Sequence, residues 1–155
     1  MKKIEIIEYH PSLKNYFSDI NYAWIKKYFV IEEMDRKMLN DPEEYILKKE
    51  GHILFARYEN KIVGTVALIK KGEKIVELAK MGVDEEYQGK GIGKKLIEAA
   101  IQKAKKTGFQ TIFLVSNTIL QTAISLYKKM GFVEVPFDAS KSGYDRCDIK
   151  MELFV

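Results

Sequence analysis

The chain has 155 residues, of which 46% are hydrophobic and 31% charged, and a formal net charge of +4. This size and mixture are typical of one globular domain with its own core, and the weak positive charge excludes the dense basic face of a dedicated nucleic-acid-binding protein. No segment approaches the roughly 18 consecutive apolar residues of a membrane span, and the first residues alternate with charge, unlike a signal peptide. We therefore expect a cytoplasmic protein with no membrane or nucleic-acid partner.

The N-terminal third is predicted to be one strand followed by helices. Residues 4–9 alternate between apolar and polar side chains, as a strand does, and residues 12–38 have a helical pattern rich in aromatic side chains. A short helix follows, because Asp41 is a good N-cap and Pro42 suits the first helical position. Gly51 is expected to end this region.

The next segment contains three strand-like runs and a long helix. The runs "HILFARY", "KIVGTVALIK" and "KIVELAKMGV" are separated by short turns, which predicts an antiparallel meander over residues 52–83. After a glycine-rich loop, apolar residues recur every four positions from Ile92 to Ala104, so they form one stripe of a helix. Gly108 is the expected end of this helix.

The last segment is predicted to contain a strand at residues 111–115, a helix that ends at Gly131, and a final strand at residues 147–155. The strand-helix-strand passage through the glycine loop implies a right-handed crossover between two parallel strands. The whole is one α/β domain with an otherwise antiparallel sheet. Cys147, the only cysteine, is interpreted as a core residue of the final strand, and an internal disulfide is excluded.

The loop before the long helix has the features of an anion site. Glycines at 89, 91 and 93 allow positive φ and a close approach of backbone N–H groups, and the positive end of the helix dipole points at the same place. Residues 88–108 carry six lysines against one carboxylate, Glu98. A plain strand-to-helix turn and a solvated helix face are the alternatives, although such a turn rarely needs three glycines.

Two common phosphate motifs do not fit this loop. A Walker loop would need glycine where the chain has Gln88 and a hydroxyl residue where it has Lys95. A dinucleotide fingerprint would need glycine where the chain has Lys94.

The loop Gln88-Gly89-Lys90-Gly91-Ile92-Gly93 resembles the pyrophosphate-binding signature of the GCN5-related N-acetyltransferases (GNAT), Gln/Arg-x-x-Gly-x-Gly/Ala. "ELAKMGV" is similar to the fourth strand of that family, "TIFLVSN" to its fifth, and "AISLYKKMGF" to its closing helix, in the same chain order. The resemblance covers residues 51–151. It is weak over the N-terminal helices, which vary with substrate in this family.

The resemblance implies a single acetyltransferase domain over residues 1–155, with a mixed, mostly antiparallel sheet of about six to seven strands flanked by about four helices. Within this domain, residues about 12–50 would form the variable helices on the acceptor side. Residues of about 51–135 would form the acetyl-CoA core, and residues of about 132–155 a C-terminal hairpin. Similar proteins are often dimers, so a homodimer is one option.

The implied reaction is transfer of an acetyl group from acetyl-CoA to a primary amine of a small molecule or peptide, by direct attack in a ternary complex. In the family, a glutamate at the position of Glu77 acts as base, directly or through water, and a tyrosine at the position of Tyr127 protonates the leaving thiolate. A solvated Glu77 and a core Tyr127 are the alternatives. No metal is expected, because His10 and His52 lie far apart without a cysteine partner.

The resemblance also implies the residues that hold acetyl-CoA. The family usually has an asparagine at the position of Leu120, so its role is transferred to Asn117, with an ordinary turn asparagine as the alternative. The expected cofactor-binding residues are Met81, Gly82, Val83, Gln88, Gly89, Lys90, Gly91, Ile92, Gly93, Lys94 and Asn117.

Trp24 and Tyr28, one helical turn apart, are candidates for the wall of an acceptor pocket, with core packing as the alternative. The loop at residues 136–146 is expected to lie beside the acceptor. A non-catalytic acyl-CoA-binding sensor stays open as a second function.

Overall fold

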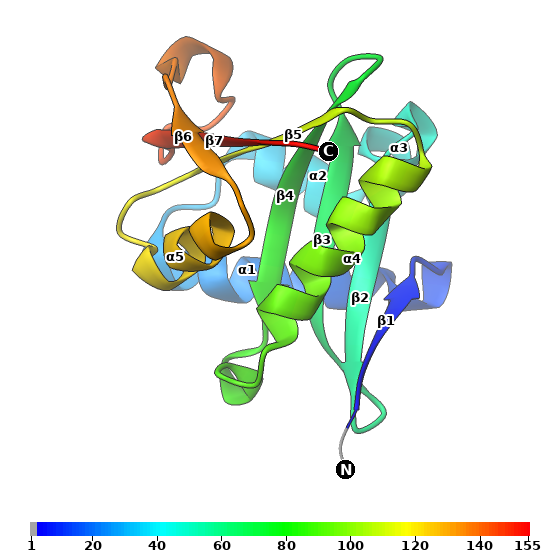
Figure 1. Ribbon diagram of the computed structural model, residues 1–155. Helices are drawn as coiled ribbons and strands as arrows, with labels where there is room; N and C mark the ends of the chain where they lie inside the picture. The colour runs from blue at the N-terminus through cyan, green and yellow to red at the C-terminus, as the bar shows by residue number, and fades with distance from the viewer. Residues whose placement is uncertain (1–2) are drawn as a thin grey trace.

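The computed structural model describes residues 3–155 and, within them, one sheet of seven strands in the order β1-β2-β3-β4-β5-β7-β6 (Figure 1). The strands are β1 (Ile4–Glu8), β2 (His52–Tyr58), β3 (Lys61–Lys70), β4 (Ile75–Val83), β5 (Thr111–Ser116), β6 (Val133–Val135) and β7 (Ile149–Phe154). The helices are α1 (Lys14–Tyr28), α2 (Glu33–Asn40), α3 (Pro42–Tyr45), α4 (Ile92–Lys106) and α5 (Gln121–Lys129). The predicted α/β fold with a mixed, mostly antiparallel sheet is confirmed.

The central strands form as their sequences predict. β2, β3 and β4 pair antiparallel, since their apolar and β-branched runs are interrupted only by short turns. Glu59 and Asn60, which join β2 to β3, adopt φ of 51° and 65°, as a type I′ hairpin turn requires. β4 and β5 are parallel, with α4 as the connection between them. The predicted crossover between parallel strands is therefore confirmed.

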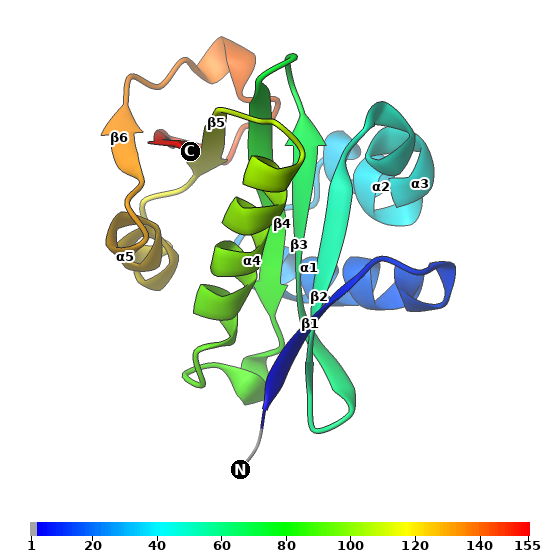
Figure 2. The ribbon, with the colours of Figure 1, turned by 45° about the vertical axis from the view of Figure 1, so that its right-hand side comes forward.

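Helices cover both faces of the sheet (Figures 1 and 2). α4 lies on one face and buries Ile92, Leu96, Ile97, Ala100 and Ala104 against β1 to β4. α1 and α2 lie on the opposite face, where Phe17, Ile25, Met38 and Leu39 form a second apolar cluster with β2 and β3. None of the helices within residues 3–155 is long and apolar enough to cross a membrane.

The helical pattern expected over residues 12–38 is split into two helices. α1 ends at Tyr28, and α2 begins at Glu33 after four residues of irregular backbone. The cause is a capping box, in which the Glu32 side chain accepts from the N3 backbone and the Asp35 side chain accepts from the Glu32 N–H. The break turns α2 back across the sheet and brings Asp35 to its buried position.

β4 and β5 are paired over only part of their length. Hydrogen-bonded pairing runs from Ile75–Glu77 to Thr111–Phe113, although β4 continues to Val83 and β5 to Ser116. The rest of β4, residues 78–83, therefore presents one edge to open space rather than to a neighbouring strand. Parallel strands that diverge in this way leave backbone N–H and C=O groups available to a ligand.

A β-bulge interrupts β4 shortly after its pairing with β5 ends. Thr65 pairs with Gly82 and Ala67 with Ala79, so Lys80 and Met81 together oppose a single residue of β3. Lys80 takes a φ of 53°, which is uncommon for a non-glycine residue. The bulge directs the Lys80 side chain into the protein, where it is buried.

A buried carboxylate receives this lysine. Asp35 on α2 accepts a hydrogen bond of 2.5 Å from Lys80 Nζ. Arg146, in the loop before β7, donates two hydrogen bonds of 2.7 Å to the same carboxylate. Burial alone would raise the pKa of Asp35, but the hydrogen bonds and charges of Arg146 and Lys80 hold it at about 2. Asp35 is therefore ionised at neutral pH and joins α2, β4 and the C-terminal loop.

The substitution Asp35→Asn is expected to lower the free energy of unfolding by about 3–5 kcal/mol, because Lys80 and Arg146 would stay buried without their shared anion. Urea unfolding followed by circular dichroism measures this. Asp19→Asn, which changes an exposed carboxylate of α1, is the control and should change stability by less than about 0.5 kcal/mol. Because the pKa of Asp35 is lowered from 3.8 to about 2, the difference should shrink as the pH falls through that interval. Equal stability of Asp35→Asn and the wild type at neutral pH would show that the Asp35 carboxylate does not stabilise the fold.

Candidate functional site

A large cleft of about 440 Å³ opens where β4 and β5 diverge. We call it the large cleft. Its walls come from the second half of β4, the end of β5, the glycine loop, α5 and the exposed end of α1. Most of the residues predicted to bind a cofactor line it, namely Met81, Gly82, Val83, Gln88, Gly89, Gly91, Ile92, Gly93 and Lys94. Lys90 does not line the cleft. Its ammonium lies 5.8 Å from the centre of the Tyr58 ring, which is not part of the cleft either.

The glycine loop has the geometry of an anion cradle. Gly89 and Gly91 adopt φ of 80° and 82°, and a Cβ at either position would meet no atom within 4 Å. The backbone conformation therefore calls for glycine here, and the space beside it is open. Gly91 is the N-cap of α4, no side chain caps the helix, and its first turn contains no acidic residue. The N–H groups of that turn and the helix dipole remain available to an anion.

Gly82 is small for a reason that the sequence did not reveal. The resemblance places Gly82 among the acetyl-CoA-binding residues, where a missing side chain would leave room for the ligand. A Cβ at Gly82 would instead lie 2.8 Å from Trp24 Cδ1 and 3.0 Å from Ile20 Cγ2. Gly82 thus lets α1 pack closely on β4, and this contact places Trp24 at the edge of the large cleft.

Tyr127 on α5 reaches the large cleft from the side opposite β4. Its ring packs edge-on against Phe132, with 6.0 Å between ring centres, and its side chain is 7% exposed. No hydrogen bond within residues 3–155 holds its hydroxyl. Burial raises the pKa of Tyr127 to about 12, so the phenol keeps its proton at neutral pH.

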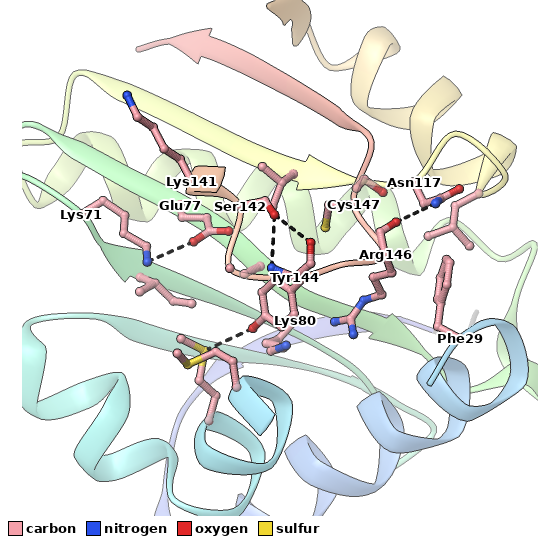
Figure 3. A pocket seen from close by; sticks show the side chains of 18 of the residues that line it. Phe29, Lys71, Glu77, Lys80, Asn117, Lys141, Ser142, Tyr144, Arg146 and Cys147 are labelled. Carbon is pink, nitrogen blue, oxygen red and sulfur yellow. Dashed lines mark hydrogen bonds and ion pairs between the residues drawn. The ribbon is translucent and has the colours of Figure 1, made fainter. Parts of the chain in front are cut away.

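A second cavity of about 150 Å³ adjoins the large cleft (Figure 3). We call it the small pocket. The two cavities share wall residues, which are Trp24, Ala79, Lys80, Val115, Ser116 and Leu120. The rest of the small pocket comes from α2, the ends of β3 and β4, and the loop of residues 141–147. This loop is part of the segment that was predicted to lie beside an acceptor.

Glu77 lines the small pocket from β4 and is only 7% exposed. Its Oε1 lies 3.6 Å from Lys71 Nζ, as Figure 3 shows. Burial raises the pKa of Glu77 above its ordinary value, and the nearby charges of Lys71 and Lys80 oppose that rise. The side chain is not solvated on the outer face, which was the alternative interpretation. A buried carboxylate with a raised pKa suits a general base that works near neutral pH.

The other predicted residues are placed as follows. Asn117 lines the small pocket rather than the large cleft, and its amide is already engaged, donating to the Arg146 carbonyl at 2.6 Å and accepting from the Ile119 N–H at 2.9 Å. Trp24 lines both cavities, whereas Tyr28 lines only the large cleft. Trp24 and Tyr28 therefore do not form one wall of the small pocket.

Sequence reasoning missed the charged and aromatic groups at the centre of the small pocket. The Tyr144 ring packs against both Lys80 and Arg146, with 4.4 Å and 4.5 Å from its centre to Lys80 Nζ and to the Arg146 guanidinium carbon. Cys147 lies in the loop before β7, not in the strand core as expected, and lines the pocket. Burial raises the pKa of its thiol to about 11, so it is not a thiolate at neutral pH.

The sequence and the fold both match known acetyltransferases. Residues 17–132 match the family described as "Acetyltransferase (GNAT) family". The chain is 30% identical over 110 residues to the uncharacterized N-acetyltransferase YjgM of Escherichia coli (strain K12), which covers 68% of this chain and 66% of YjgM. It is 36% identical over 106 residues to the uncharacterized N-acetyltransferase YvbK of Bacillus subtilis (strain 168), covering 65% and 67%. The chain thus spans about two thirds of the length of these relatives.

Solved structures agree over the whole length of the chain. An acetyltransferase of the GNAT family from Staphylococcus aureus Mu50 superposes with a TM-score of 0.87 at 27% identity, covering 98% of this chain and 99% of that one. The PaiA N-acetyltransferase of Thermoplasma acidophilum, solved in complex with coenzyme A, has the same fold, with a TM-score of 0.75 at 20% identity over 99% of each chain. This chain belongs to the GNAT family of acetyltransferases.

The substitution Gly91→Asp is expected to abolish acetyl-CoA binding, because it places a carboxylate in the open space of the anion cradle. Gly108→Asp is a matched control, since Gly108 has a φ of 89°, also has no atom within 4 Å of an added Cβ, and ends the same helix. It carries the same backbone strain and added charge at the far end of α4. Calorimetry with acetyl-CoA measures both variants. Normal binding by folded Gly91→Asp would show that the loop holds no phosphate.

Proposed function

We propose that this protein moves an acetyl group from acetyl-CoA to a primary amine by direct attack, with both substrates bound at once. The observation that carries this proposal is the meeting of two cavities along β4, with an anion cradle at the far end of one and a buried carboxylate in the other. The names of the relatives and the coenzyme A complex of the Thermoplasma fold neighbour support it.

The large cleft fits acetyl-CoA. The N–H groups of the glycine loop and the start of α4 would hold the pyrophosphate, with Lys94 beside them. The edge of β4 at Met81, Gly82 and Val83 is unpaired toward β5, so its backbone groups are free to hydrogen-bond the amides of the pantetheine arm. When bound there, acetyl-CoA supplies an activated acetyl group as a thioester.

Glu77 is the proposed base. An amine attacks only in its neutral form, so a proton acceptor must take its excess proton near pH 7. Glu77 lines the small pocket, two residues before Ala79, which lines both cavities, and its raised pKa suits this task. The proton passes from the amine to Glu77 directly or through a water molecule.

Tyr127 is the proposed acid. Tyr127 lines the large cleft, and its hydroxyl keeps its proton at neutral pH and has no hydrogen-bond partner within residues 3–155. In this proposal it gives a proton to the leaving sulfur from the side of the cleft opposite β4. Asn117 is proposed to support acetyl-CoA binding indirectly, through the turn that it stabilises, and not by the direct contact that the resemblance implies.

The substitution Tyr127→Phe is expected to lower kcat by roughly 10²-fold or more, the usual contribution of a general acid, without weakening acetyl-CoA binding. The assay incubates acetyl-CoA with a pooled amine panel and reads thiol release and acetylated products by mass spectrometry. Tyr16→Phe, which removes an exposed hydroxyl of α1, is the control. Unchanged turnover would remove Tyr127 from the mechanism. Acetyl-CoA binding without acetylation of any amine would favour the sensor function.

The pH profile tests Glu77. A base works only when ionised, so activity should fall as the pH drops through the raised pKa of Glu77. Lys71→Met removes a positive charge that opposes this rise, so the acid limb of the kcat/KM profile should move to higher pH. Lys74→Met, in the same hairpin but outside the small pocket, should leave the limb in place. A Lys71→Met profile that matches the wild type would argue that another group titrates.

A further inference from the structure

The small pocket limits the size of the amine. Its volume of about 150 Å³ is that of a cavity known to hold one benzene molecule. One wall is the loop of residues 141–147, which is tied down at several points. The Arg146 carbonyl accepts from Asn117, its guanidinium binds Asp35, and the Asp145 N–H donates to Glu32 Oε1 at 2.9 Å. A pocket closed by a fixed loop takes a small molecule more readily than a folded polypeptide.

The charges around the small pocket favour an anionic group on that molecule. Four cations line it, Lys71, Lys80, Lys141 and Arg146, against one carboxylate, Glu77. Lys80 and Arg146 are held by Asp35, and Arg146 also lies 3.4 Å from Glu32 Oε2. Lys71 and Lys141 therefore set the charge that a ligand meets, together with Glu77.

These three residues lie on the same side of the small pocket, with Arg146 on the other (Figure 3). Lys71 is half-exposed and only loosely paired with Glu77, at 3.6 Å. Lys141 is exposed and has no acidic partner within 4 Å among residues 3–155. In Figure 3 the Lys71 ammonium points toward Glu77, whereas the Lys141 side chain extends outward and would swing inward to reach a ligand there.

The small pocket also has an apolar part. Met34 and Met38 of α2 and Ile69 of β3 belong to it, and sulfur-containing side chains adapt readily to compact apolar groups. The Tyr144 hydroxyl also lies here, and its one protein contact is a weak one of 3.9 Å to Met38 Sδ. It is free to bind a polar atom of a ligand.

We propose that the acceptor is an α-amino acid with a compact apolar side chain. This inference rests on the acetyltransferase function proposed above and names its substrate class. The amine lies beside Glu77, the carboxylate beside Lys71 and Lys141, and the side chain against the methionines. The amine nitrogen bonds to the acetyl carbon, the carbon–sulfur bond breaks, the amine proton passes to Glu77, and Tyr127 gives a proton to the leaving sulfur. The products are an N-acetyl amino acid and the free thiol of CoA.

The same charges disfavour the other small amines. A polyamine would bring several positive charges to a pocket whose free groups are mainly lysines, and like charges repel. An amino acid brings a carboxylate that pairs with them. Specificity then comes from a difference between attraction for one class and repulsion of the other.

The test compares leucine with leucinamide, which has the same shape without the negative charge, and adds 3-methylbutylamine and spermidine. Leucine should have a kcat/KM at least about tenfold above that of leucinamide, as expected for one charge-assisted contact. Lys141→Met should remove most of this preference through KM and leave acetyl-CoA binding unchanged. Lys105→Met, which removes an exposed lysine of α4, should keep the preference.

Each other outcome overturns the inference. Equal or better use of leucinamide, 3-methylbutylamine or spermidine would overturn the substrate class and leave the acetyltransferase function intact. Acetyl-CoA binding without acetylation of leucine would do the same. No binding of acetyl-CoA at all would overturn the proposed function, and the substrate class with it. A leucine preference that persists in Lys141→Met would show that this lysine does not select the carboxylate.

Discussion

One buried carboxylate holds the functional region together. Asp35 accepts hydrogen bonds from Lys80 on β4 and from Arg146 in the C-terminal loop, so three segments distant in sequence meet at a single ionised group. Removing water from three charges is costly, and the arrangement is stable only when all partners are present. The loop that closes the small pocket is thereby fixed in place, and so is the lysine at the bulge of β4. The proposed substrate selection would depend on an ion cluster that itself takes no part in the proposed chemistry.

The second constraint is the early end of pairing between β4 and β5. A crossover of two parallel strands normally buries both edges, yet here the hydrogen bonds stop at Glu77 and Phe113. The unpaired edge, the start of α4 and the hydroxyl of Tyr127 all face the same space. The backbone thus provides most of the large cleft, while side chains provide most of the small pocket. This division explains why a family motif identifies the first cavity and reveals little about the second.

The sequence predicts the parts of the fold that depend on local rules. The β2–β3 turn, the Asp41 cap and the glycine loop each follow from residues next to one another, and each is found. The break between α1 and α2 was not predicted, because its capping box uses glutamate and aspartate, which also occur within helices. The ion cluster was out of reach, since its partners are 45 and 111 positions apart. Taken singly, Asp35, Lys80 and Arg146 look like solvated charges.

The bulge of β4 also limits how this protein can change in evolution. Side chains alternate along a strand, and an extra residue reverses the alternation beyond it. Glu77 lines the small pocket, Ala79 and Lys80 line both cavities, and the residues after Lys80 line the large cleft alone. The one strand would thus contact both proposed ligands. An insertion in the exposed turn between β3 and β4 would leave that arrangement intact, whereas one between Glu77 and Gln88 would move the base away from the phosphate cradle. The length of this segment therefore fixes the distance between Glu77 and the glycine loop.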